Sequence, residues 1–146
     1  MIRKIIAVLV GGILFIALVG VIVGIFARLG ITPEGQFIQS AFKERTGEET
    51  AEFIASDEGF NLMSQGVNFI GFVILPAISI IAGFLTGWLS KTKGWVCSII
   101  AIGPFAIFIM GYGSLTSVFS IMICILLAAI GGYGANKLIT ARSKRV

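Results

Sequence analysis

Residues 94–136 read GWVCSIIAIGPFAIFIMGYGSLTSVFSIMICILLAAIGGYGAN, a stretch of 43 residues without a charged side chain. A helix that crosses a bilayer needs about 20 mostly apolar residues, so this stretch is too long for one crossing and fits two. The glycines and serine at 111–114 are typical of a tight turn that divides the stretch. The sequence therefore predicts two membrane-spanning helices here, over about 95–110 and 115–133.

Two more apolar segments of spanning length precede this stretch. The first covers residues 5–27, between Lys4 and Arg28. The second covers about 67–89 and ends before Lys91. The first is longer than the apolar core of a cleaved signal peptide, which has roughly 7–15 residues, so we expect it to be retained. The predicted fold class is all-α: a polytopic integral membrane protein with four transmembrane helices in two hairpins.

The composition of the whole chain agrees with a membrane protein. Of its 146 residues, 57% are hydrophobic and 12% are charged, and the mean hydropathy is +1.03. A soluble domain has about 25% charged residues, so this chain cannot cover a soluble globule with polar side chains. The composition excludes a secreted disulfide scaffold, a nucleic-acid-binding domain and a disordered tail. We expect the lipid bilayer as a partner and no nucleic acid.

Charged residues divide between the two sides of this four-span arrangement. All seven acidic residues lie in the segment 28–66, here called the acidic loop, which also has three basic residues and therefore a net charge of −4. The other eight basic residues lie near the start of the chain, between the second and third spans, and in a tail over 137–146. Because Lys and Arg are retained in cytoplasmic loops, we predict a plasma-membrane protein with both termini cytoplasmic and the acidic loop outside.

The acidic loop has the patterns of short amphipathic helices. Thr32, Pro33 and Glu34 are typical of a helix start, with a capping hydroxyl, a proline at the first helical position and an acid in the first turn. Thr46 and Glu49 have the spacing of a capping box, which predicts a second helix. We therefore expect an amphipathic helical extracytoplasmic loop.

Three acidic residues of this loop are spaced four residues apart: Glu44, Glu48 and Glu52. On an unbroken helix they would form one stripe, and carboxylate oxygens are the ligands of hard cations. Gly47 interrupts the stripe, so a solvated helix face is the favoured interpretation. We predict no metal site.

The predicted spans lack the residues that membrane enzymes and proton pumps use. The chain has no histidine, and no Asp, Glu, Lys or Arg lies inside a predicted span. A proton relay needs ionisable groups within the membrane, and nucleophilic catalysis needs a base beside the nucleophile. We expect no catalytic residue, no cofactor and no enzymatic activity. Cys97 and Cys124 are expected at different depths, each as a small buried hydrophobic residue.

Small residues recur in the spans at the spacing that lets membrane helices approach closely. The chain has 19 glycines, about twice the ordinary share of about 7%. Two G-x-x-x-G motifs and one related pair comprise Gly20, Gly24, Gly83, Gly87, Ala128 and Gly132. Small residues at this spacing permit close backbone contact in lipid. Packing within the four-helix bundle is the favoured interpretation, and a surface that assembles with another subunit is the alternative.

Two prolines are expected about halfway through their spans, Pro76 in the second and Pro104 in the third, where Gly103 precedes it. Each proline removes a backbone donor and frees a carbonyl oxygen one turn earlier. This region could therefore line a small polar pocket. Simple kinks are the favoured interpretation, because few polar side chains are nearby.

Aromatic residues mark the expected membrane surfaces. Trp88 and Trp95 flank the basic segment between the second and third spans, and Tyr112 lies at the opposite end of the third span. Tryptophan and tyrosine are enriched at the headgroup level because their rings are amphipathic. We interpret all three residues as interface anchors.

The leading functional hypothesis is a non-catalytic small membrane protein that acts as an assembly, scaffold or accessory subunit. It would bind through its glycine-rich helix faces and its acidic loop, either to a membrane-protein partner or to further copies of itself. One alternative is a homo-oligomeric facilitator or channel for a small neutral solute, which would use the proline region. Another is a lipid-organising or envelope-stress membrane protein, which would bind lipid and have no fixed protein partner.

Overall fold

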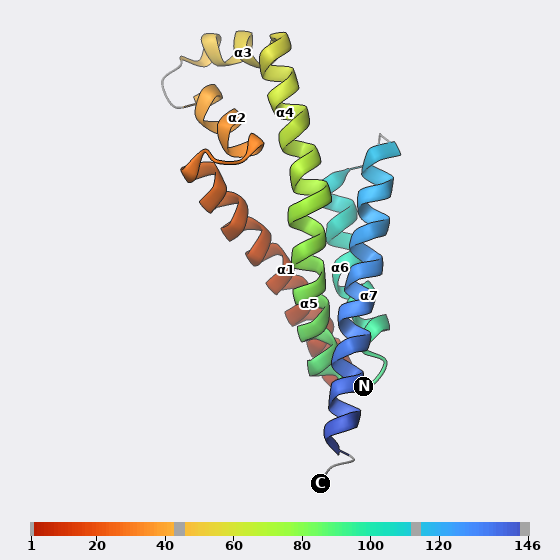
Figure 1. Cartoon of the computed structure of the whole chain (residues 1–146). Helices are drawn as coiled ribbons and strands as arrows, with labels where there is room; N and C mark the ends of the chain where they lie inside the picture. The colour runs from red at the N-terminus through yellow and green to blue at the C-terminus, as the bar shows by residue number, and fades with distance from the viewer. Residues whose placement is uncertain (1, 43–45, 112–114, 144–146) are drawn as a thin grey trace. The chain divides into compact units, whose positions relative to one another are not determined.

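The computed structural model describes residues 2–42, 46–111 and 115–143, and its regular elements over these residues are all helical (Figure 1). In chain order they are α1 (Ile2–Leu29), α2 (Pro33–Phe42), α3 (Gly47–Ala55), α4 (Asp57–Phe69), the π-helical turn η1 (Ile70–Ile74), α5 (Leu75–Ser90), α6 (Gly94–Met110) and α7 (Leu115–Ser143). Three continuous helices are long and apolar enough to cross a membrane: Ile2–Leu29, Asp57–Ser90 and Leu115–Ser143. The predicted all-α class is confirmed, and α6 is a shorter apolar helix.

The helices form two compact units. The first, here called the glycine-packed unit, consists of Met1–Leu18 and Leu75–Val146. The second, here called the acidic unit, is Val19–Ile74. The boundaries therefore fall within α1 and at the end of η1.

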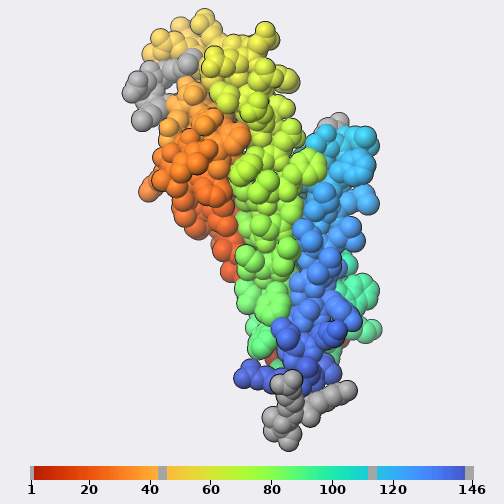
Figure 2. Space-filling view, viewed as in Figure 1, coloured from red at the N-terminus to blue at the C-terminus, as the bar shows by residue number. Residues whose placement is uncertain are grey.

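Small residues bring α5 and α7 of the glycine-packed unit into backbone contact. A Cβ added at Gly83 would lie 2.8 Å from the Cα of Ala128, and one at Gly87 would lie 2.7 Å from the Cα of Gly132. Neither distance can accommodate a side chain, so glycine is required at both positions of α5. Figure 2 shows the side chains of α5 and α7 meeting along this face of the unit.

The first half of α1 packs in the same way but with a different motif. A Cβ at Gly11 would collide with the side chain of Thr86, and one at Gly12 would lie 3.2 Å from the carbonyl oxygen of Ala101. Ala7 and Phe15, one turn to either side of Gly11, are fully buried. The packed face of this segment therefore contains Ala7, Gly11 and Phe15, which are spaced four residues apart. The first two of these residues, Ala7 and Gly11, form a small-xxx-small pair.

Buried hydroxyl groups inside the glycine-packed unit find partners in the backbone. Ser79 and Thr86 each donate a hydrogen bond of 2.7 Å to the carbonyl oxygen four residues earlier in α5. Ser98 of α6 donates to the carbonyl oxygens of Gly83 and Gly94, at 2.8 Å each. Polar groups in lipid have no water to bind, so these internal bonds make the hydroxyls compatible with a membrane interior.

Pro76 follows directly after η1, in the first turn of α5. Because proline has no N–H, the carbonyl oxygen of Phe72 loses its usual helical donor. A single wider turn at Ile70–Ile74 accommodates this loss without ending the helix, as π-bulges commonly do. The predicted span 67–89 is thus part of a longer continuous helix over Asp57–Ser90.

The acidic unit has short helices whose ends are capped by side chains. Thr46 and Glu49 form a complete capping box at the start of α3, which confirms the predicted helix start. Ser56 caps α4 by accepting a 3.1 Å hydrogen bond from the N–H of Gly59. Figure 1 shows α3 running across the ends of α2 and α4. The rings of Phe37 and Phe53 stack between α2 and α3, with centroids 6.3 Å apart.

The connection from α1 to α2 is closed by a glycine and a glutamine. Gly30 has a φ of +62°, and its N–H donates to the carbonyl oxygen of Phe26 at 3.0 Å. The Gln39 side chain donates to the carbonyl oxygens of Ala27 and Arg28, at 3.3 and 2.9 Å. These bonds satisfy carbonyl groups that the end of a helix leaves without partners.

Candidate functional site

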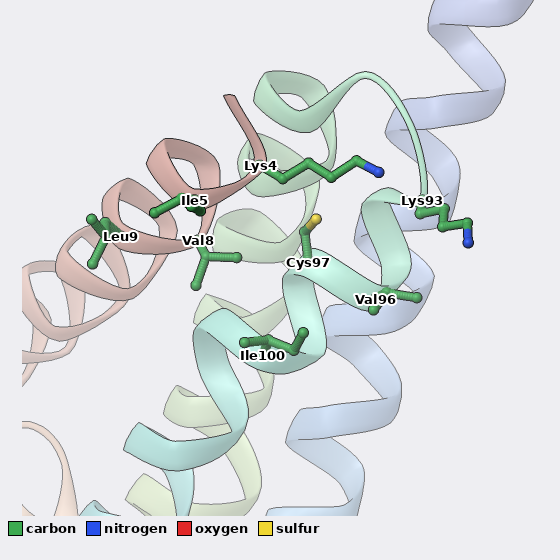
Figure 3. A pocket seen from close by; sticks show the side chains of 8 residues that line it. All are labelled: Lys4, Ile5, Val8, Leu9, Lys93, Val96, Cys97 and Ile100. Atoms are coloured by element: carbon green, nitrogen blue, oxygen red, sulfur yellow. The ribbon is translucent and has the colours of Figure 1, made fainter. Parts of the chain in front are cut away.

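The three cavities that we describe all lie in the glycine-packed unit, at the end with its basic residues. The first is a groove of about 370 Å³ between the N-terminal turns of α1 and α6 (Figure 3). Eight residues line it: Lys4, Ile5, Val8 and Leu9 from α1, Lys93 directly before α6, and Val96, Cys97 and Ile100 from α6. We call it the Lys4–Lys93 groove.

The other two cavities share Trp88 and Arg142. The larger one, of about 480 Å³, is lined by Arg3, Trp88, Leu89, Lys91, Ile139, Arg142 and Ser143. The smaller one, of about 310 Å³, also involves Leu138 and Ala141. The Nε of Arg3 donates a 2.7 Å hydrogen bond to the carbonyl oxygen of Leu89, which fixes the first turn of α1 beside the end of α5.

The sequence of the glycine-packed unit contains no acidic residue at all. Its eight basic residues are Arg3, Lys4, Lys91, Lys93, Lys137, Arg142, Lys144 and Arg145. No side-chain carboxylate of the unit can neutralise them. The chemistry of this end therefore fits a ligand with a negative charge.

The loop between α5 and α6 holds two of these lysines in an unusual backbone conformation. Lys91 and Lys93 have φ values of +60° and +50°. A residue with a side chain in this left-handed region costs of order 1–3 kcal/mol. Lys93 is also the N-cap residue of α6, where Ser, Thr, Asp and Asn are preferred, and its own side chain makes no cap.

Asn136 of α7 caps α6 in place of Lys93. In the amide orientation that satisfies all of its neighbours, its oxygen accepts hydrogen bonds from the N–H groups of Gly94 and Lys93, at 2.7 and 3.2 Å. Its nitrogen donates to the carbonyl oxygen of Gly87 at 3.2 Å. One side chain thus connects α5, α6 and α7, and it holds the backbone of Lys93 at the mouth of the groove.

Two of the three predicted interface anchors belong to the described residues. Trp88 and Trp95 are exposed, on either side of the basic loop, and the Trp88 ring lies 6.0 Å from that of Phe84. Tyr112 lies outside the described residues, together with most of the predicted turn at 111–114. Their role as anchors stays a prediction.

The predicted proline region does not line any of the three cavities. Pro104 is exposed on α6, whereas Pro76 is buried in α5. Gly103 is buried, and a Cβ there would meet only the end of the Ile125 side chain, at 3.9 Å. The described cavities therefore give no support to a pocket at the two prolines.

Two of the predicted packing glycines are not packed. Of the described atoms, none lies within 4 Å of a Cβ built on Gly20 or Gly24, and both residues are exposed. A role of these two residues in helix packing stays a prediction. Gly83, Gly87, Ala128 and Gly132 lie together in the α5–α7 contact described above, so one G-x-x-x-G motif is filled and the other is open.

Sequence reasoning missed a buried carboxylate in the acidic unit. The Glu34 side chain is only 4% exposed, and neither of its oxygens has a hydrogen-bond partner among the described residues. The Thr32 hydroxyl is also buried without a partner, so its predicted capping role is wrong. A Cβ at Gly66 of α4 would lie 2.9 Å from the Cα of Glu34, so the absence of a side chain at Gly66 lets the two helices bury the acid.

Metal ligands do not gather elsewhere in the described part of the chain. No group of three or more His, Cys, Asp and Glu residues lies close enough there to hold a metal ion. Glu44 of the predicted acidic stripe lies outside the described residues. Cys97 and Cys124 are buried free thiols, and Cys124 lies against the hydroxyls of Ser79 and Ser120.

No protein-family model, curated protein or solved structure matches this chain. What the basic end can bind follows from its own residues. The Lys4–Lys93 groove is lined almost wholly by apolar atoms, with Lys4 and Lys93 at one end, and neither a nucleophile–base pair nor a set of metal ligands lines it.

Proposed function

We propose that this protein is a non-catalytic membrane subunit that assembles with another membrane protein through the second half of α1. The observation that carries the proposal is the open face of Gly20 and Gly24. Exposed apolar residues Val21 and Ile25 lie next to them on the same helix. The partner is a membrane helix with small residues of its own, because close backbone approach is what such a face permits in lipid.

The contrast with the other G-x-x-x-G motif supports this proposal. Gly83 and Gly87 have the backbone of α7 directly against them. Gly20 and Gly24 have the same spacing with nothing against them. A partner helix packed against Gly20 and Gly24 would give this motif the same kind of backbone contact that α7 gives Gly83 and Gly87.

The proposed topology has four spans, with both termini in the cytoplasm of a plasma-membrane protein and the acidic loop (28–66) outside. The shortest span is α6, whose 17 residues extend about 25 Å at 1.5 Å per residue. Membrane helices range from about 17 to 25 residues, so α6 is at the lower limit. Four spans also place eight basic residues on one side of the membrane and all seven acidic residues on the other. The basic side is then the cytoplasmic side, because basic loops are retained there.

The acidic unit offers the partner a charged surface as well. Glu48, Glu52 and Asp57 are exposed, and the exposed ring of Phe60 follows on the same helix as Asp57. A partner with basic residues on its outer segment would be favoured by this charge. Complementary charge raises the association rate and excludes wrong partners.

Native mass spectrometry on tagged protein from its own membrane, in a mild amphiphile, tests the proposal. The wild-type chain is expected with a second protein at fixed stoichiometry, and Gly20→Leu with Gly24→Leu is expected to lose that protein while the subunit stays folded. Gly134→Leu is the matched control, because Gly134 is an open glycine on α7. It should retain the partner.

Three results would overturn the proposed assembly. A bare monomer that carries only lipids would favour the lipid-organising alternative. A homo-oligomer without a second protein would favour the facilitator, and solute flux in liposomes would then be the next measurement. Retention of the partner by the Gly20 and Gly24 double variant would show that α1 is not the contact.

A further inference from the structure

We propose that the Lys4–Lys93 groove is a binding site for one anionic phospholipid. The phosphate of the lipid lies at the end of the groove that carries Lys4 and Lys93, and one acyl chain lies along the apolar wall. This site is at the basic end of the glycine-packed unit, and it does not depend on the assembly proposed for α1.

The order of residues along both helices places charge at one end of the groove and carbon at the other. On α1, Lys4 is followed by apolar lining residues through Leu9, and on α6, Lys93 is followed by apolar lining residues through Ile100. These segments extend about 8 and 10 Å along their helices, at 1.5 Å per residue. Figure 3 shows the Lys4 side chain extended above Cys97, with Ile100 farther along the groove and the Lys93 side chain directed away from both.

The shape of the groove fits an acyl chain better than a free anion. Cys97 forms a floor that is only 5% exposed, whereas Ile5, Leu9 and Ile100 are 52%, 60% and 55% exposed. The groove is therefore open along its side and lined by carbon for most of its length. An inorganic phosphate would engage the mouth and leave the apolar wall unused.

The charge of this region favours an anion at the mouth. The unit has no acidic residue, so Lys4 and Lys93 have no carboxylate there to pair with. Lys93 lies at the N-terminus of α6, where the helix dipole adds positive potential. Its left-handed backbone and the Asn136 cap hold it at this position. A strained backbone at a charged residue is typical of a ligand-binding position.

The test is lipid titration of the delipidated full-length chain, followed by native mass spectrometry. The probes are phosphatidylglycerol and phosphatidylcholine with identical acyl chains. The wild-type chain is expected to retain one phosphatidylglycerol in preference to phosphatidylcholine. Lys4→Gln with Lys93→Gln is expected to reduce that preference by about tenfold, since each lysine near a membrane surface favours anionic lipid.

A matched double variant separates a site from general surface charge. Lys91→Gln with Lys137→Gln removes the same charge, but neither residue lines the groove. It should change the preference less than twofold. An equal loss in both double variants would overturn the proposal, because it would mean that the basic end attracts anionic lipid without a defined site.

A third variant tests the acyl chain. Ile100→Trp fills the open side of the groove from an exposed position, so it should fold and weaken the binding of both lipids. Unchanged lipid binding by this variant would overturn the proposed chain position. Displacement of phosphatidylglycerol by glycerol phosphate or inorganic phosphate would show a simple anion site instead. The helical circular dichroism of each variant serves as the folding control.

Discussion

The glycine-packed unit and the acidic unit bury their polar groups in opposite ways. In the first, the buried hydroxyls of Ser79, Thr86 and Ser98 all donate to backbone carbonyl oxygens. In the second, the buried Glu34 carboxylate and Thr32 hydroxyl have no partner among the described residues. The first arrangement leaves none of these three hydroxyls without a partner. The second stores an unfavourable interaction, as functional regions often do.

The two units also differ in what brings their helices together. Glycine and alanine let the backbones of the first unit touch, as at Gly87 and Gly132. The second unit uses aromatic rings and helix caps, such as Phe37 against Phe53 and Thr46 with Glu49. In lipid, apolar burial does not drive helix association, so dense packing of small residues takes its place. The first unit therefore holds its helices together by the kind of contact that suits lipid.

The largest effect is expected from Gly87→Leu. Its side chain would meet the backbone of α7, which cannot move aside as a flexible side chain can. Overpacking usually costs 1–3 kcal/mol, and a clash with backbone should exceed about 3 kcal/mol. Thermal unfolding in a mild detergent would measure the loss. Gly134→Leu, on an open face of α7, should unfold within a few degrees of the wild-type chain; an equal loss there would contradict the packing contrast.

The next effect concerns the shared cap of the first unit. Asn136→Leu removes two acceptor contacts and one donor contact and leaves the N–H of Gly94 without its partner. The expected loss is about 1–3 kcal/mol. The same unfolding assay applies, with Thr140→Ala as its control, because the Thr140 hydroxyl is exposed and bonds within its own helix. If both variants unfold alike, Asn136 does not connect the helices as described.

A gain in stability is expected from Glu34→Met in the acidic unit. The change removes a buried carboxylate without a partner and keeps an unbranched side chain of similar length. Replacing buried charge with apolar side chains is often stabilising by about 1–4 kcal/mol, and the lower half of this range is expected here. Glu52→Met, at an exposed position, should change stability by less than about 0.5 kcal/mol. A destabilised Glu34→Met would mean that the carboxylate has a partner in the folded protein.

The smallest effect is expected at the strained loop. Lys93→Gly relieves a φ of +50° and should raise stability by about 0.5–1 kcal/mol. Lys137→Gly, within α7, should lower stability by about 1 kcal/mol, because glycine is unfavourable inside a helix. The opposite signs make the pair a sharp test of backbone strain at Lys93. The free energy of unfolding should be measured by denaturation in a detergent without lipid, so that bound lipid does not contribute to the difference between the two variants.

Much of the helical organisation follows from sequence patterns. The uncharged stretch over 94–136, the apolar segments before it and the Thr46–Glu49 capping box all predicted helices that the structure contains. These patterns are local, because a capping box or an apolar run acts within a few helical turns. The four-span count, the sidedness and the function stay predictions.

The candidate site was only partly visible in the sequence. Lys4 and Lys93 stood out as charges beside spans, but they are far apart along the chain, and only helix packing places both on one groove. Spacing alone could not separate the filled motif at Gly83 from the open one at Gly20. The packing of α1 through Ala7, Gly11 and Phe15 could have been predicted, because Ala7 and Gly11 have the same small-xxx-small spacing.

Composition and local periodicity are enough to predict an all-helical chain suited to lipid, with its acids in one segment and most of its basic residues elsewhere. The packing of the helices settles which glycines touch another backbone, that Glu34 is buried, and that Asn136 caps a helix other than its own. Each of these depends on which helix faces lie together, and that is set by contacts between residues distant in the chain.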